Sequence, residues 1–341
     1  MEVKNRESHT FRNISHLFSY LSDEFTSIDK PFNIFIVLPD SNVTIDSVQD
    51  IANKKGIYFE IKEKGEKIYT IWLGIRKKQL EAHIIQLKEF WLLLTFDDSQ
   101  KARQSVKSFI RHTSSLISLG YVPSRRLLDF LNELRKNYDI TLHESFIRTE
   151  KETMRKWTKS HKKLSDNMVK RMKNIEGKWV AITFKAHIDG FEKFHCRIYE
   201  DGNITFYSGD FRDFYSTILL PYSVVCKDIS STLSNRERKS WNSEILLYPI
   251  SLQLKRCLNR SDLESLSNKL LKRYSGGAFF MGNPLLMMTI IDNNNGSSFD
   301  LYAKEKNIEI VPLAKSTSAS LSNLIQTITD ILPDAATTNF S

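Results

Sequence analysis

The sequence predicts an α+β (mixed α/β) fold of two lobes joined by a long helix. The chain has 341 residues, about the length of two ordinary domains, and 41% of them are hydrophobic, enough for a core in each lobe. Helical and strand patterns alternate in the first part, whereas apolar runs separated by turns dominate the last part. We therefore expect an N-terminal α/β lobe at 1–145, a long basic connecting helix at 146–177, a C-terminal lobe of antiparallel β meanders with helices at 178–333, and a flexible tail at 334–341.

The elements of the first lobe follow from local patterns. Apolar residues at i, i+3, i+4 and i+7 predict helices, and short apolar runs that end in turn residues predict strands. Lys64-Gly65-Glu66 lies between two apolar runs and predicts a hairpin. The expected helices are 10–27, 46–54, 77–88, 99–120 and 124–136, and the expected strands are 32–38, 57–62, 68–73 and 90–96.

The C-terminal lobe has more residues that favour tight turns than the first lobe. Asp189-Gly190 and Asp201-Gly202-Asn203 separate apolar runs and offer positive φ, which favours tight turns between antiparallel strands. Ser261 and Glu264 have the spacing of a capping box, so a helix begins there and ends at Gly276-Gly277. The expected strands are 179–186, 191–199, 204–207, 215–226, 285–291, 298–303 and 308–311, and a closing helix is expected at 318–332.

The segment between the lobes has the pattern of one amphipathic helix. Thr149 and Glu152 form a T-x-x-E capping box, and Gly177 stands where a helix would stop. A helix of this length would be about 40 Å long, equal to the rise of about twelve base pairs of duplex. Its apolar residues recur every three or four positions and form one narrow stripe: Met154, Trp157, His161, Leu164, Met168, Met172 and Ile175.

The basic residues of this segment are expected on the opposite face of the helix. They are Arg148, Lys151, Arg155, Lys156, Lys159, Lys162, Lys163, Lys170 and Lys173, with Arg171 at the edge of this face. These ten residues stand against three acidic ones between 148 and 173, a surplus of +7 in a chain whose net charge is +9. The positive charge is therefore local.

A row of cations with few acids favours a polyanion as partner, because lysine and arginine neutralise phosphates and release counterions. We expect an intracellular nucleic-acid-binding protein that contacts DNA or RNA backbone without sequence preference, as an accessory subunit with a protein partner. Three alternatives stay open: a plain solvated helix, binding to an anionic membrane surface or acidic protein, and an assembly module without nucleic acid.

A second pattern concerns catalysis. Pro39-Asp40, followed by Glu60-Ile61-Lys62 on a strand, resembles the PD-(D/E)xK nuclease signature. The resemblance covers five residues and implies that Asp40 and Glu60 hold Mg²⁺ while Lys62 orients water. Strand alternation places Glu60 and Lys62 on one face. Solvent-exposed strand residues of no catalytic role are the alternative interpretation.

No other cofactor or metal site is expected. The sequence contains no GxxxxGK[ST], GxSxG or HExxH motif, so Mg²⁺ is implied only by the nuclease alternative. The three cysteines are scattered, which favours a reducing compartment. The first seven residues are polar and include acid, unlike a signal peptide, and no run of 18 apolar residues predicts a membrane span. We expect a cytoplasmic protein.

Overall fold

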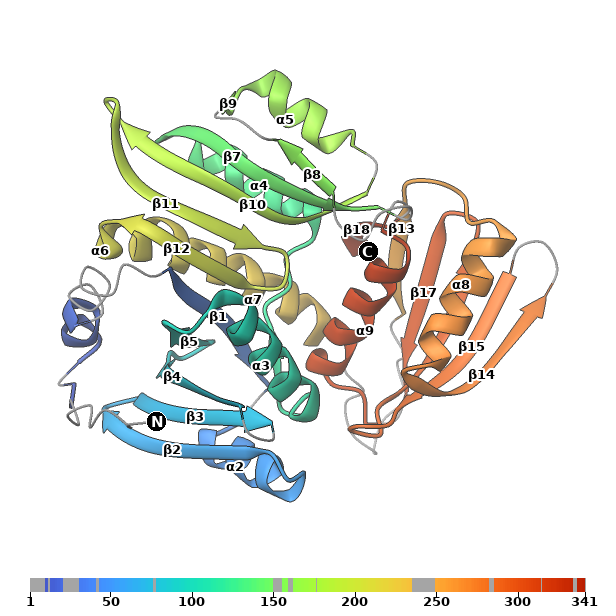
Figure 1. The fold of residues 1–341 in the computed structure, drawn as a ribbon. Helices are drawn as coiled ribbons and strands as arrows, with labels where there is room; N and C mark the ends of the chain where they lie inside the picture. The colour runs from blue at the N-terminus through green and yellow to red at the C-terminus, as the bar shows by residue number, and fades with distance from the viewer. Residues whose placement is uncertain are drawn as a thin grey trace.

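The structure is a computed structural model, and it contains two antiparallel sheets with helices on and between them (Figure 1). This arrangement confirms the predicted α+β class. The structure describes residues 10–11, 13–20, 31–40, 43–75, 78–149, 155–158, 162–175, 177–234, 249–281, 285–313, 315–333 and 336–340.

The larger sheet has 12 strands in the order β2-β3-β4-β5-β1-β12-β11-β10-β7-β8, with β6 paired to β1 and β9 paired to β7. All of its pairs are antiparallel. Its strands are β1 (Phe32–Pro39), β2 (Tyr58–Gly65), β3 (Ile68–Ile75), β4 (Lys78–Gln86), β5 (Trp91–Thr95), β6 (Ile117–Leu119), β7 (Asp139–Arg148), β8 (Arg155–Thr158), β9 (Lys162–Lys163), β10 (Lys178–Ile188), β11 (Phe191–Tyr199) and β12 (Asn203–Gly209).

The smaller sheet has six strands in the order β14-β15-β16-β17-β13-β18. It contains the strands expected at 285–291, 298–303 and 308–311. Its strands are β13 (Ile250–Leu254), β14 (Tyr274–Met281), β15 (Leu285–Asp292), β16 (Ser298–Lys304), β17 (Asn307–Pro312) and β18 (Ala336–Phe340).

Helices cover both faces of the larger sheet around β1. Ile34 and Ile36 of β1 pack in one core, and Phe35 and Val37 in another, which confirms the predicted buried strand. The first core includes α4 (Ser124–Leu134), α5 (Asp166–Lys173), α6 (Phe211–Phe214), the π-helix η1 (Tyr215–Leu219) and α7 (Leu220–Ser234); the second includes α2 (Ile45–Lys54) and α3 (Ser99–His112).

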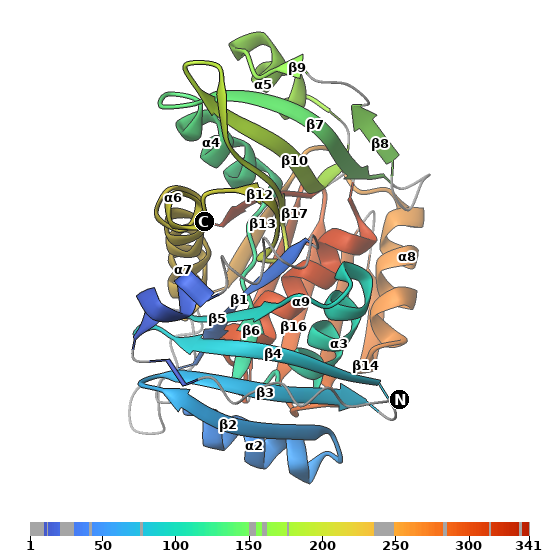
Figure 2. The same cartoon turned by 60° about the vertical axis from the view of Figure 1, so that its left-hand side comes forward.

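One helix, α9 (Ser318–Ile331), lies between the two sheets. α8 (Arg260–Leu271) and α9 share a core with the smaller sheet. α9 also contacts α7 and β6, so it lies between the sheets (Figures 1 and 2).

Two predicted helices end too late: residues 117–119 of the helix expected at 99–120 are strand β6, and Gly276-Gly277, expected to end a helix, lie in β14. Two further elements are wrong in type. The helix expected at 77–88 is strand β4, where Leu80, Ala82 and Ile84 are buried at every second position. The strand expected at 215–226 is η1 and the start of α7, where Tyr222 and Cys226 lie one turn apart in the core. In both segments, packing against distant partners decides between two patterns that short apolar runs leave ambiguous.

The long basic helix is also wrong. Its middle contributes β8, which pairs with β7 in the register Phe146↔Lys156, and β9, which pairs with another part of β7. The helix α5 begins only at Asp166, because the Ser165 side chain accepts a hydrogen bond from the Met168 N–H and caps it. Long-range strand pairing therefore outweighs the helical periodicity of the segment.

Two further expectations differ from the structure. The tail expected to be flexible contains β18, which pairs with β13 in the register Leu252↔Phe340. Strands from both sides of 146–177 pair within the larger sheet, β12 with β1 and β10 with β7. Pairing across this segment joins the two expected lobes in one sheet.

Candidate functional site

The helices α4 and α5 form an antiparallel pair at the end of the molecule farthest from β2 (Figure 2). Arg135, after the end of α4, forms an ion pair with Asp166 at the start of α5. At the other end, Lys173 Nζ lies 2.7 Å from Asp129 Oδ1. Trp179 holds this end, since its backbone N–H donates to Ser124 Oγ (2.9 Å) and its ring N–H donates to the Met172 carbonyl (3.1 Å).

The structure divides the ten predicted nucleic-acid-binding residues into several groups. Lys151 and Lys159 lie outside the described residues, and only the backbone of Arg155 and Lys156 is described, on β8. Arg148, Lys163 and Lys173 are paired with Asp330, Asp139 and Asp129, at 2.5, 2.7 and 2.7 Å. Lys162, Lys170 and Arg171 are exposed.

Exposed cations of α4 extend this group. Within the described ranges, none of the following residues forms an ion pair, and all are solvent-exposed; we call them the basic surface: Arg125, Arg126, Lys162, Lys170 and Arg171. The side-by-side packing of α4 and α5 brings them to one end of the molecule. α4 has 11 residues and is about 16 Å long, so the basic surface is much shorter than the expected rod.

The structure does not bring Asp40 close to Glu60 and Lys62. β2 and β1 are separated by β3, β4 and β5, so Glu60 on β2 lies about 19 Å across the sheet from the end of β1, where Asp40 lies. Asp40 accepts a hydrogen bond from Ser318 Oγ (2.5 Å), and Glu60 accepts one from the Tyr58 hydroxyl. Glu60 and Lys62 do share the exposed face of β2 as alternation predicts.

These positions do not fit a Mg²⁺ site. A divalent cation needs its carboxylates within about 2–2.6 Å of one point, and Asp40 and Glu60 are too far apart to share an ion. No three metal-ligating side chains gather anywhere in the described part of the chain. We therefore derive no metal-dependent step from these residues.

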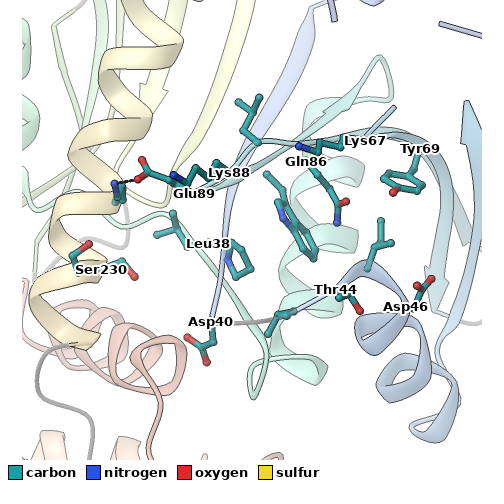
Figure 3. Close-up of a pocket in the computed structure, with 17 residues that line it drawn as sticks. Leu38, Asp40, Thr44, Asp46, Lys67, Tyr69, Gln86, Lys88, Glu89 and Ser230 are labelled. Atoms are coloured by element: carbon teal, nitrogen blue, oxygen red, sulfur yellow. Dashed lines mark ion pairs between the residues drawn. The ribbon is translucent and has the colours of Figure 1, made fainter. Parts of the chain in front are cut away.

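Asp40 instead lines a cleft of about 690 Å³ between α2, the β4–β5 hairpin and α7, in which Ser230 of α7 lies at one end (Figure 3). Asp46 lies at the opposite end, and Trp91 contributes to the lining. Lys227 and Glu89 form an ion pair across one wall. Charges of both signs line this cleft, so it is not a basic surface.

A buried ionic network, which sequence reasoning missed, joins the larger sheet to α9. Lys178 Nζ on β10 lies 3.0 Å from Glu200 Oε1 and also pairs with Asp330 of α9. Burial raises the pKa of Glu200 to about 7, despite the attraction of Lys178. Burial likewise raises the pKa of the nearby Tyr121 to about 12. The only signal in the sequence is a lysine at the start of an apolar run.

A second half of this network lies at the turn between β11 and β12. Asp201 pairs with Arg103 (2.9 Å) and Lys107 (2.6 Å) of α3. Although burial opposes ionisation, the two cations hold the pKa of Asp201 well below its usual range. The two halves line a cavity of about 70 Å³ together with Arg148. Each cation here faces a carboxylate, so the network is suited to holding elements together.

The open face of β7, β11 and β12 carries a row of planar side chains. His195 lies with its ring centroid 5.0 Å from that of His143 and 4.8 Å from that of Tyr207. The Arg197 guanidinium lies 5.1 Å from the centroid of Phe146 and pairs with Glu144 at 2.9 Å. Burial, with help from His143, lowers the pKa of His195 to about 4, so this ring is neutral at neutral pH.

Comparison of the chain with protein-family models, with curated proteins and with solved structures gives no match. Each helix within the described ranges is too short or too polar to cross a lipid bilayer.

Proposed function

We propose that the protein binds nucleic acid through phosphate contacts from the basic surface on α4, β9 and α5. One observation carries the proposal: the antiparallel packing of α4 and α5 leaves Arg125, Arg126, Lys162, Lys170 and Arg171 exposed and without ion pairs among the described residues. Three acids of α4 and α5 are engaged by other cations: Asp129 by Lys173, Asp166 by Arg135 and Glu133 by Lys136. Arg125 and Arg126 also line a groove that contains Asp228 of α7.

The physics of such a surface favours binding to the backbone over reading of bases. Lysine and arginine side chains neutralise phosphates and release condensed counterions, and this contribution is independent of sequence. Five such contacts predict that log K falls with log salt with a slope of about −4 to −5 on duplex DNA, or about −3 to −4 on a single strand. DNA and RNA are both suitable partners.

The test is a charge reversal at one place with a matched reversal elsewhere. The triple variant Lys162→Glu, Lys170→Glu, Arg171→Glu is compared with Lys269→Glu, Lys272→Glu, Lys304→Glu, whose lysines are exposed on α8, after α8 and on β16. Both variants change the net charge equally. Fluorescence anisotropy with labelled single- and double-stranded oligonucleotides of several sequences measures binding over a range of salt concentrations.

We expect the first variant to lose at least tenfold in affinity on every sequence and to show a shallower salt slope, whereas the second binds as the wild type does. If the two variants lose affinity equally, the effect comes from overall charge, and the basic surface is not the interface. If the wild-type protein binds no oligonucleotide at low salt, the proposed function is wrong.

A further inference from the structure

The strand β14 (Tyr274–Met281) is the outermost strand of the smaller sheet (Figure 1). Among the described residues only β15 pairs with it, so its outer edge presents backbone N–H and C=O groups to no other strand. Edge strands are commonly protected by charged side chains or proline. The sequence of β14, YSGGAFFM, contains neither. The outer edge is therefore suited to pairing with another strand.

Small and large residues lie on opposite sides of Ala278 in β14. Gly276 and Gly277 precede it, and Phe279 and Phe280 follow it. The two phenylalanines are 67% and 50% exposed, among the most exposed large apolar side chains of the described chain. A Cβ on Gly277 would lie 3.8 Å from the Phe279 ring, an ordinary van der Waals contact, so the strand leaves room for an aromatic ring over this glycine.

We infer that β14 pairs antiparallel with β14 of a second copy of the chain, about a two-fold axis that passes between the two Ala278 residues. This register places Phe279 opposite Gly277 of the second copy and Phe280 opposite Gly276 of the second copy. Residues directly opposite in an antiparallel pair share one face of the sheet, so each ring covers a glycine that has no side chain of its own.

The order of glycines and phenylalanines in β14 also favours a second copy of the chain as the source of the pairing strand. Large residues at 279 and 280 and glycines at 276 and 277 are complementary to themselves only when the strand is reversed, which is the relation that a two-fold axis creates. A slip of one residue would turn every side chain to the wrong face. The strand is uncharged, so two chains of net charge +9 bring no like charges together within the paired residues.

The first test measures the mass of the full chain in solution by light scattering coupled to size exclusion. We expect about twice the chain mass of 39.7 kDa for the wild type. Phe279→Lys should give the single-chain mass. Phe191→Lys is the matched control, because Phe191 is 75% exposed on the β10–β11 hairpin and lies outside β14. A monomeric wild type, or a dimer that Phe279→Lys leaves intact, would overturn the inference.

The second test concerns the register. Paired Cα atoms lie about 4.5–5.5 Å apart, within the range of a disulfide, so Ala278→Cys should form a disulfide-linked dimer under mild oxidation. The two Ser275 residues would lie about 20 Å apart, so Ser275→Cys should not. Both variants carry Cys257→Ser, which removes the exposed cysteine. Equal cross-linking of the two variants, or none in Ala278→Cys, would contradict the two-fold axis at Ala278.

Discussion

Lys178 Nζ and Glu200 Oε1 lie 3.0 Å apart in the interior, where the side chains are 4% and 10% exposed. Lys178 also reaches α9, where it pairs with Asp330 and donates a hydrogen bond to Thr329 Oγ1 (3.3 Å). These contacts tie the larger sheet to the helix that lies between the two sheets. The protonation of Glu200 therefore affects the contact between the larger sheet and α9.

Glu200→Gln should change the pH dependence of stability. Burial raises the pKa of Glu200 to about 7, so the native state keeps this proton while the unfolded state has lost it above pH 4.5. The wild type therefore loses stability relative to the variant as pH rises from about 4.5 to 7, by about 3 kcal/mol. Urea unfolding of both proteins at intervals from pH 4.5 to 8 measures the difference. A constant difference across this range would contradict the raised pKa.

Asp201→Asn should show the opposite dependence. Arg103 and Lys107 hold the pKa of Asp201 well below its usual range, so its carboxylate stabilises the native state above pH 4, and this contribution is lost as pH falls through the native pKa. We expect the variant to be less stable by about 3 kcal/mol at pH 7, because it leaves two cations without their carboxylate. The difference should shrink toward pH 3. Thermal unfolding followed by circular dichroism is the measurement, and a cost that is equal at both pH values would count against the ion pair.

Gly202→Ala should destabilise the protein much more than Gly190→Ala. Both glycines have positive φ, +70° and +82°, so both substitutions incur the strain of the left-handed region, about 1–2 kcal/mol. A Cβ on Gly202 would also lie 2.7 Å from the Gly120 carbonyl oxygen, whereas a Cβ on Gly190 meets nothing within 4 Å. We expect about 2 kcal/mol of additional loss in Gly202→Ala. Equal denaturation midpoints for the two variants would mean that the backbone at Gly120 moves aside.

Local chemistry is the part of the fold that the sequence predicts well. The apolar run from Phe32 is β1, and Asp98 caps α3 by accepting from the Gln100 and Lys101 N–H groups. Gly190 and Gly202 adopt positive φ in the predicted turns. Each of these features depends on residues that are neighbours in the chain, so the sequence carries the information directly.

Features that depend on distant partners could not be predicted in this way. Arg155–Thr158 is a strand because β7 pairs with it, and nothing within the segment specifies that partner. The same holds for Lys178, whose partners Glu200 and Asp330 are remote in the sequence. The sequence does show the local surplus of positive charge. The predicted placement of this charge along one long helix is wrong, because the helical spacing of apolar residues is the same whether or not a strand partner is present.

The pairing of β1 with β12 places Phe32 opposite Phe206 in the middle of the larger sheet. A ribosome that adds about 5–20 residues per second needs roughly 10–30 s to make the chain between these two strands. During that interval one edge of β1 has no β12 to pair with, and the apolar side chains that later face α7 stay uncovered. Folding of this sheet is therefore complete only after β12 has emerged, and until then β1 is an apolar strand with an unpaired edge, the kind of segment that favours aggregation.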